Sequence, residues 1–121
     1  MQLVTKKQPI SREQLSHQEL AAGHWQQLSL LEQMANIGSE VGRAVNACEQ
    51  RNESRALGAS QRAFELFDLT LNDPKLKHRL KEIARARECF ADYFLGENQY
   101  GFTGEWWQKY FLDFAIAARN A

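Results

Sequence analysis

Arg87 is the residue whose position most strongly suggests chemistry. It lies near the centre of an arc of apolar side chains on a predicted helix, where a helical repeat calls for an apolar residue. The neighbours in this arc are Leu80, Ile83, Ala84, Phe90, Ala91 and Phe94. A guanidinium keeps its proton, so a buried arginine needs an acidic partner. Glu40 and Asp68 border the apolar faces of two other predicted helices, and we predict that Arg87 contacts one of them.

Three interpretations of Arg87 stay open. The ion pair fixes the register of two helices and does nothing else, or the helices separate at one end and Arg87 lines a small anion-binding pocket. In the third interpretation the side chain reaches along the apolar surface and places its charge in water. The ligand-binding residues of the second interpretation would be Glu40, Arg43, Arg79, Glu82, Arg85, Arg87 and Glu88.

Sequence motifs for metals, cofactors and nucleophilic catalysis are missing. Di-iron bundles use Glu-x-x-His pairs on facing helices, and no glutamate here has a histidine three residues later. Zinc needs a closed set of Cys and His ligands, whereas the two cysteines and three histidines are scattered. The chain has no Walker loop, dinucleotide fingerprint or Gly-x-Ser-x-Gly elbow. We therefore expect no metal, no cofactor and no catalytic residue.

Two further clusters are candidates for binding a partner. Residues 73–88 are locally basic, which is typical either of a solvated face or of a phosphate-contacting one. Most aromatic residues lie between 90 and 114. One helix cannot bury the adjacent Trp106 and Trp107 on the same face, so one of them stays partly exposed. Exposed Trp and Tyr are common interface anchors, so Trp106, Trp107 and Tyr110 form either a subunit contact or the packing under a loop.

Four amphipathic helices must position these residues, because apolar side chains recur at alternating steps of three and four and no segment alternates as a strand would. We predict helices over 29–49, 54–71, 74–95 and 103–119. The expected caps are Ser29 with Glu32, Ser54, Asp73 and Thr103, and Gly96 ends the third helix. Their loops are short, which predicts an all-α, up-and-down antiparallel four-helix bundle over residues 23–121. Residues 1–22 form an arm with a short extra helix that begins at Ser11.

The composition excludes several classes of protein. The 121 residues fit one domain, and 15 basic against 15 acidic residues leave no bulk charge for a nucleic acid or an anionic membrane. No signal peptide or bilayer-spanning run is present, so we expect a cytoplasmic protein without membrane contact. Cys48 and Cys89 lie beside apolar residues and predict buried free thiols. Gly38 and Gly42 indicate a close helix approach, in the core or at a homodimer contact.

Two stretches carry a resemblance to known proteins. WQQLSLLEQMANIGSEVGRA and RLKEIARARECFADYF resemble an uncharacterised family of small all-helical proteins from bacteria and archaea, over about residues 25–118. The family pattern covers residues 37–40, Arg43 and the charged set Arg79, Glu82, Arg85, Arg87 and Glu88. The resemblance implies a single helical domain and gives no activity.

The predicted bundle also looks like the HEPN superfamily, whose members include RNases and partners of nucleotide transferases. Active RNases of that superfamily carry an Arg, four to six residues and then a His within a core helix. The match here is Arg12 to His17, in the N-terminal arm, and no His follows Arg85 or Arg87. This departure argues against RNase activity and leaves a nucleotide- or RNA-binding role for Arg79, Arg85 and Arg87.

The sequence therefore favours a non-catalytic bundle that acts through protein–protein contacts as a homodimer, and a protein encoded nearby is a possible further partner. The alternative is a HEPN-like protein that binds a nucleotide or RNA. A third hypothesis is an enzyme built on Glu40, Arg87 and Glu88. A basic surface continuous with a pocket over Arg87 would favour binding of a phosphate ligand, whereas an apolar interface with Trp106 or Trp107 would favour the homodimer.

Overall fold

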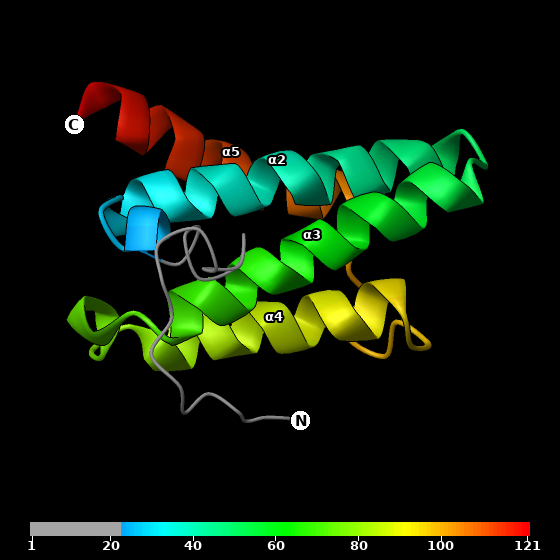
Figure 1. The fold of residues 1–121 in the computed structure, drawn as a ribbon. Helices are drawn as coiled ribbons and strands as arrows, with labels where there is room; N and C mark the ends of the chain where they lie inside the picture. Colours follow the sequence, from blue (N-terminus) through cyan, green and yellow to red (C-terminus); the bar gives the residue numbers. More distant parts are fainter. Residues whose placement is uncertain (1–22) are drawn as a thin grey trace, which may run out of the picture.

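The computed structural model describes residues 23–121, and this part of the chain is helical and contains no strand. Its elements are α2 (Leu30–Glu49), α3 (Glu53–Leu71), a short 3-10 helix η3 (Pro74–Leu76), α4 (Leu80–Phe94) and α5 (Gly104–Asn120) (Figure 1). The arm over residues 1–22, the helix expected from Ser11 and the Arg12–His17 pair lie outside the described residues. The all-helical class is therefore confirmed for residues 23–121.

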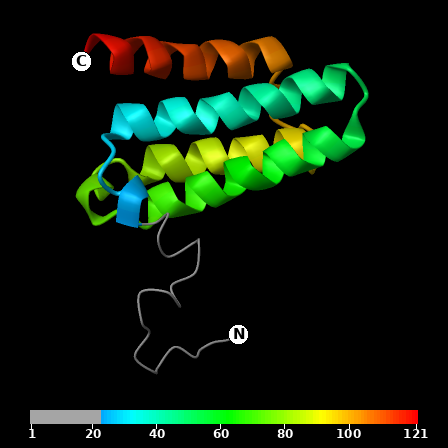
Figure 2. The same cartoon turned by 45° about the horizontal axis from the view of Figure 1, so that its top comes forward.

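Consecutive helices reverse direction along the chain, as both ribbon views show (Figures 1 and 2). The central helix α2 packs against α3 on one side and against α5 on the other, and α4 packs against α3. In contrast, α4 and α5 make few direct backbone approaches to one another. The molecule is thus least tightly closed along the seam between α4 and α5. Among residues 23–121, no helix combines the length and apolar character that crossing a bilayer requires.

Helix starts follow the capping rules closely. The hydroxyl of Ser29 accepts from the Glu32 amide at 3.2 Å, and the Glu32 carboxylate accepts from the Ser29 amide at 2.9 Å, which is the predicted capping box. Thr103 caps α5 as predicted, by accepting from the Trp106 amide at 3.0 Å. For α3 the predicted cap Ser54 was wrong: Asn52 accepts from the Arg55 amide at 3.1 Å, so the helix begins one residue before Ser54.

The predicted third helix is interrupted. Asp73 caps it as expected, but Pro74–Leu76 form only a 3-10 turn, and the α-helix starts at Leu80. Backbone bonds of the tight turn, from Leu76 to Asp73 and from Arg79 to Leu76, replace the first α-helical turn. In this arrangement the side chain of Leu76 is buried and belongs to the hydrophobic core. The prediction of a continuous helix over 74–95 was wrong, because the spacing of apolar residues alone does not distinguish a 3-10 turn from a turn of α-helix.

A single hydrophobic core joins all four α-helices. Its largest fully buried side chains include Met34, Ile37, Phe67, Phe90 and Trp107. The α2–α5 approach is closest at Gly38: a Cβ atom added there would lie 2.5 Å from the Cβ of Phe111. The predicted close approach is thus confirmed for Gly38. For Gly42 a close approach in the core was wrong, because an added Cβ would meet no atom of the described residues within 4 Å, and a homodimer contact there stays a prediction.

The two cysteines are free, but they differ in exposure. Cys89 is buried as expected, whereas Cys48 is exposed. The prediction for Cys48 was wrong although its position continues the apolar stripe of Ile37, Val41 and Ala44. Cys48 lies in the last turn of α2, which ends at Glu49, and its side chain is exposed there.

Candidate functional site

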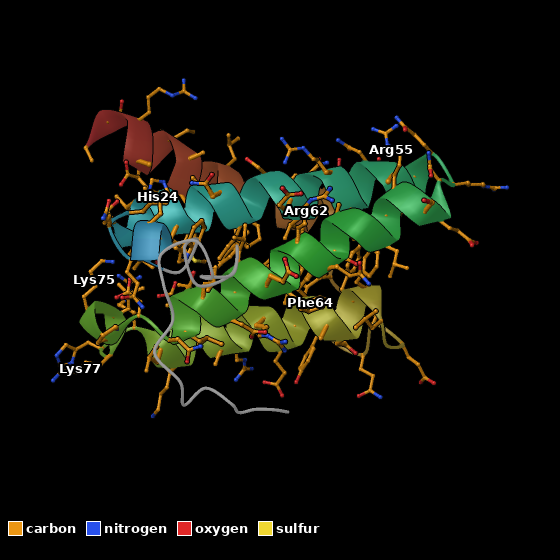
Figure 3. All side chains as sticks on the ribbon, in the orientation of Figure 1. His24, Arg55, Arg62, Phe64, Lys75 and Lys77 are labelled. Atoms are coloured by element: carbon orange, nitrogen blue, oxygen red, sulfur yellow. The ribbon has the colours of Figure 1, made fainter. Side chains whose placement is uncertain are left out.

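Arg87 pairs with Asp68, one of the two partners predicted for it. Its Nε donates to Oδ1 of Asp68 at 2.8 Å, and its Nη2 donates to Oδ2 at 3.4 Å. The pair joins α4 to α3, and the guanidinium also lies over the ring of Phe64, 5.1 Å from its centroid. Figure 3 shows Phe64 on α3 where this helix faces α4. The contact therefore holds two neighbouring helices together.

The burial expected for Arg87 was wrong. About a third of its side chain is exposed (35%), and Asp68 is 55% exposed. The buried residues of α4 are Ile83, Ala86, Cys89 and Phe90. The helix is thus rotated so that Arg87 lies at the border of its buried face instead of the centre, while Ala84 is exposed. A pair this accessible to water contributes little to stability.

The structure does not gather the seven predicted ligand-binding residues into one site. Glu40 accepts from Arg43 and from Arg62 of α3, each at 3.1 Å. On α4, Arg79 donates twice to Oε1 of Glu82, at 3.0 and 2.6 Å. Since α3 lies between α2 and α4 in the packing, the predicted residues fall into separate groups. The α2 group is Glu40 and Arg43, and the α4 group is Arg79, Glu82, Arg85, Arg87 and Glu88.

The α2 group borders a polar groove between α2 and α3, which we call the arginine groove. Arg43, Arg55 and Arg62 line it, and its volume is about 400 Å³. Figure 3 shows Arg55 and Arg62 along α3 beside α2. The remaining lining residues are Asn46, Ala47, Gln50, Ser54, Gly58 and Ala59. Arg43 and Arg62 share Glu40, and Arg55 makes no ion pair among the described residues, so the groove keeps an excess of positive charge that would attract an anion.

The α4 group contributes to a second hollow, which we call the α4–α5 pocket. Its volume is about 270 Å³, and it lies on the seam where α4 and α5 diverge. Five of the predicted site residues line it: Glu82, Arg85, Trp106, Trp107 and Tyr110. Ala86, Cys89, Tyr100 and Phe102 complete its walls. The structure thus unites residues that the sequence suggested separately, as charged ligands and as aromatic anchors.

The two adjacent tryptophans divide as predicted, with one exposed and one buried. Trp106 is 40% exposed, whereas Trp107 is 1% exposed. The prediction that Trp107 is an interface residue was therefore wrong, because a side chain that is 1% exposed offers no surface to a partner protein. The Trp106 ring stacks on Tyr110 at a centroid distance of 5.2 Å and on Phe102 at 4.0 Å. These stacked rings form one wall of the α4–α5 pocket.

Polar groups around this pocket are mainly hydrogen-bond donors. Burial, and secondly the negative charge of Glu82, raise the pKa of Tyr110 to about 12, so its hydroxyl keeps its proton. The Nε1–H of Trp107 is buried and has no acceptor within residues 23–121. The Glu82 carboxylate already accepts from Arg79. Arg85 is exposed and makes no ion pair among the described residues.

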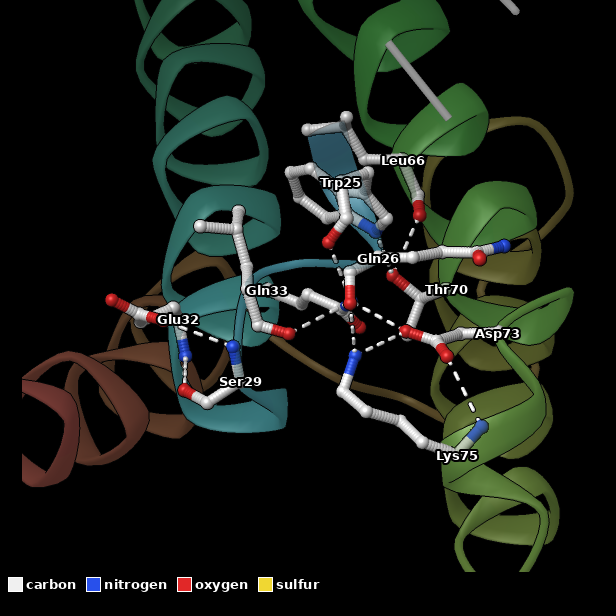
Figure 4. Close-up of polar contacts among 10 residues, drawn as sticks. Trp25, Gln26, Ser29, Glu32, Gln33, Leu66, Thr70, Asp73 and Lys75 are labelled. Carbon is white, nitrogen blue, oxygen red and sulfur yellow. Dashed lines mark hydrogen bonds and ion pairs between the residues drawn. The ribbon is translucent and has the colours of Figure 1, made fainter. Parts of the chain in front are cut away.

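A buried polar network between the end of α3 and the segment before α2 escaped sequence reasoning (Figure 4). Gln33 is fully buried, and its Nε2 donates to the carbonyl of Trp25 and to Oδ2 of Asp73, both at 2.9 Å. Trp25 Nε1 donates to Oγ1 of Thr70 at 2.9 Å. Lys75 donates to Oδ2 of Asp73 and, at 2.8 Å, to a backbone carbonyl of the segment before α2. The network ties that segment to the end of α3.

Asp73 is the charged centre of this network. Burial alone would raise its pKa, but hydrogen bonds from Lys75 and Gln33, together with the charge of Lys75, outweigh burial and lower the pKa. All contacts of the carboxylate run to neighbouring protein groups, which is typical of a structural cluster. The one sequence signal for it was the polar Gln33 directly beside the apolar stripe of α2.

Comparison of the chain with family models, with curated proteins and with solved structures found no match. Among residues 23–121, no three His, Cys, Asp or Glu side chains come together as a metal site would require.

Proposed function

We propose that the protein is a non-catalytic helical bundle that acts through protein–protein contacts and associates as a homodimer. In this proposal α2, α3, α4 and α5 form an up-and-down antiparallel bundle, and α5 carries the contact surface. The observation that supports it most is the outward face of α5. This helix lies along α2 at the edge of the molecule, and no described helix covers its far side (Figure 2).

The outward face of α5 has the spacing of a helix–helix seam. Five of the exposed residues of α5 follow steps of four, three, four and three: Glu105, Lys109, Leu112, Ile116 and Arg119. Leu112 is 52% exposed and Ile116 is 44% exposed. Side chains at this spacing stay on one stripe of a helix and suit a partner helix. Trp106, 40% exposed, borders the stripe near the start of α5.

The charges on this stripe fit a second copy of the same helix. Glu105 and Arg119 lie at equal distances along the chain from Leu112. In an antiparallel pair of α5 helices centred near Leu112, Glu105 of each copy lies level with Arg119 of the other copy. A two-fold axis then produces two identical ion pairs around an apolar centre. A parallel pair would place like charges side by side.

The oligomeric state tests this proposal directly. Light scattering after size exclusion, at hundreds of micromolar protein, should give the mass of a dimer. The double variant Leu112→Glu, Ile116→Glu should give the mass of a monomer with unchanged helical circular dichroism, because these side chains make no core contacts. The control Leu57→Glu, at a 51% exposed position on α3, should remain dimeric. A monomeric wild type, or a dimeric double variant, would contradict the proposal.

A second candidate is the HEPN-like binding of a nucleotide or RNA. The arginine groove supports it, since Arg43, Arg55 and Arg62 line one polar hollow. Arg79 and Arg87 are less suited to phosphate because each has an acid of its own, whereas Arg43 and Arg62 share the single acid Glu40. Fluorescence anisotropy with a labelled single-stranded RNA would test this role. Binding should weaken steeply with added salt, and Arg55→Gln should reduce both the affinity and the salt dependence.

The proposed location is the cytoplasm, where the free thiols Cys48 and Cys89 would stay reduced. A protein encoded nearby stays a possible further partner. Its capture by the wild type and not by the Leu112→Glu, Ile116→Glu variant would place that contact on the same stripe.

A further inference from the structure

We propose that the α4–α5 pocket binds a small planar aromatic carboxylate. The pocket does not overlap the outward stripe of α5, because its walls come from the side of this helix that faces α4. The inference is therefore independent of the homodimer. It rests on the shape and chemistry of the walls and on two unengaged donors.

The walls select a flat ring. Tyr100, Phe102, Trp106, Trp107 and Tyr110 supply most of the lining. Rings such as these stack on aromatic ligands more favourably than on flexible aliphatic chains. Tyr100 is 49% exposed and lies on the loop between α4 and α5, so it can approach a ligand without any loss of core packing. A volume of about 270 Å³ suits a ligand of one or two fused rings.

The polar groups select a negative charge on that ligand. Arg85 lines the pocket and makes no ion pair among residues 23–121, so its guanidinium is available for a carboxylate. Glu82, the acid that lines the pocket, is held by two hydrogen bonds from Arg79. Together Arg79, Glu82 and Arg85 leave one net positive charge at the pocket.

Trp107 provides the independent sign that a ligand is accommodated. Its ring lines the pocket, and its buried Nε1–H has no hydrogen-bond acceptor in the described residues. A buried donor without an acceptor loses its hydrogen bonds to water and gains none in return, so proteins rarely retain one without a reason. Trp25, the other buried tryptophan, donates to Thr70 and shows that such a partner is ordinarily supplied. A ligand oxygen would satisfy Trp107 in the same way.

Isothermal titration calorimetry with 2-naphthoate tests the proposal on the full chain. We expect one site per chain with a submillimolar dissociation constant. Arg85→Gln should weaken binding at least tenfold, because it removes the charge that faces the carboxylate and keeps the stem. The matched control Arg51→Gln, which removes an exposed guanidinium from the turn between α2 and α3 and lines neither the α4–α5 pocket nor the arginine groove, should stay within twofold of the wild type. The neutral analogue 2-naphthalenemethanol should bind at least tenfold more weakly than 2-naphthoate.

Nuclear magnetic resonance adds a local readout. The indole N–H signal of Trp107 should shift on addition of 2-naphthoate, whereas the signal of Trp25 should not. No binding at millimolar 2-naphthoate, equal binding of the neutral analogue, or equal loss in Arg85→Gln and Arg51→Gln would each overturn the proposal. Decanoate that binds as tightly as 2-naphthoate would also overturn it, since the aromatic walls would then have no selective role.

Discussion

Asp73 and Asp68 each accept hydrogen bonds from a basic side chain, but they differ in burial. We therefore expect them to contribute differently to the free energy of unfolding. Asp73 is 3% exposed and holds both Gln33 and Lys75. Asp68 is 55% exposed and holds only Arg87. Loss of a buried charged acceptor leaves its donors without partners inside the protein, whereas water replaces an exposed one. Substitutions at the two positions therefore compare a buried ion pair with an exposed one.

We expect Asp73→Asn to destabilise the protein by about 1–3 kcal/mol at pH 7. Because the folded state lowers the pKa of Asp73, its contribution is complete above the ordinary aspartate pKa and is lost as the pH falls through the lowered value. The difference between variant and wild type should therefore shrink on acidification below about pH 4. Urea unfolding at pH 7, 5 and 3 measures it, and a difference that does not change with pH would contradict the assigned role.

For the exposed pair of Asp68 and Arg87 we expect only a small effect on stability. Asp68→Ala and Arg87→Met should each change the free energy of unfolding by less than about 1 kcal/mol, because both partners already contact water. Urea unfolding at neutral pH measures both variants beside Asp73→Asn. A loss of several kcal/mol in Asp68→Ala would show that the guanidinium of Arg87 depends on this acid as a buried charge would.

The Arg87–Asp68 contact could be predicted because acidic residues beside apolar stripes are few, and the geometry of a helix limits which of them can meet. The exposure of Arg87 could not, since it depends on how far α4 rotates against α3. The buried network around Gln33 was also beyond sequence reasoning. Its members come from four separate segments, and the position of Gln33 beside the apolar stripe of α2 does not reveal which of these segments its side chain meets.

At the scale of elements, the helix ends were predictable where a side-chain cap fixes them. Ser29 and Thr103 act within one turn of the chain, so their effect is local. The break between η3 and α4 was not predictable, because it depends on burial of Leu76 by distant parts of the fold. The α4–α5 pocket has the same origin, since it forms only where two helices diverge.

Gly38 and Gly42 test the α2–α5 packing as a matched pair on one helix. Gly38→Ala should destabilise the protein by about 1–3 kcal/mol, because the new methyl group would lie 2.5 Å from the Cβ of Phe111, an atom fixed to the α5 backbone. Gly42→Ala should instead stabilise it by up to about 1 kcal/mol, since alanine favours the helix and the site is open. Thermal and urea unfolding measure both changes, and equal effects of the two substitutions would contradict this packing.

At the scale of the whole molecule, α5 is the element that presents three different faces. Its inner face supplies Trp107 and Phe111 to the core, and the side towards α4 supplies Trp106 and Tyr110 to a pocket. Its outward stripe faces no other described helix. The stripe was not predicted, because the sequence reasoning sought the interface among aromatic residues. Once the inner face is known, the exposed Leu112 and Ile116 identify it.

Charge reversal on this stripe separates a homodimer from contact with an unrelated protein. Arg119→Glu alone, or Glu105→Arg alone, should weaken dimerisation on the order of tenfold, because two symmetry-related ion pairs become two repulsions. The double variant Glu105→Arg, Arg119→Glu should restore the wild-type affinity in an antiparallel dimer, since opposite charges again lie level. Sedimentation equilibrium at low and high salt measures these constants, and salt should reduce the differences among the variants. A double variant as weak as the single ones would contradict the antiparallel pairing, because no other symmetric arrangement of α5 brings Glu105 and Arg119 together.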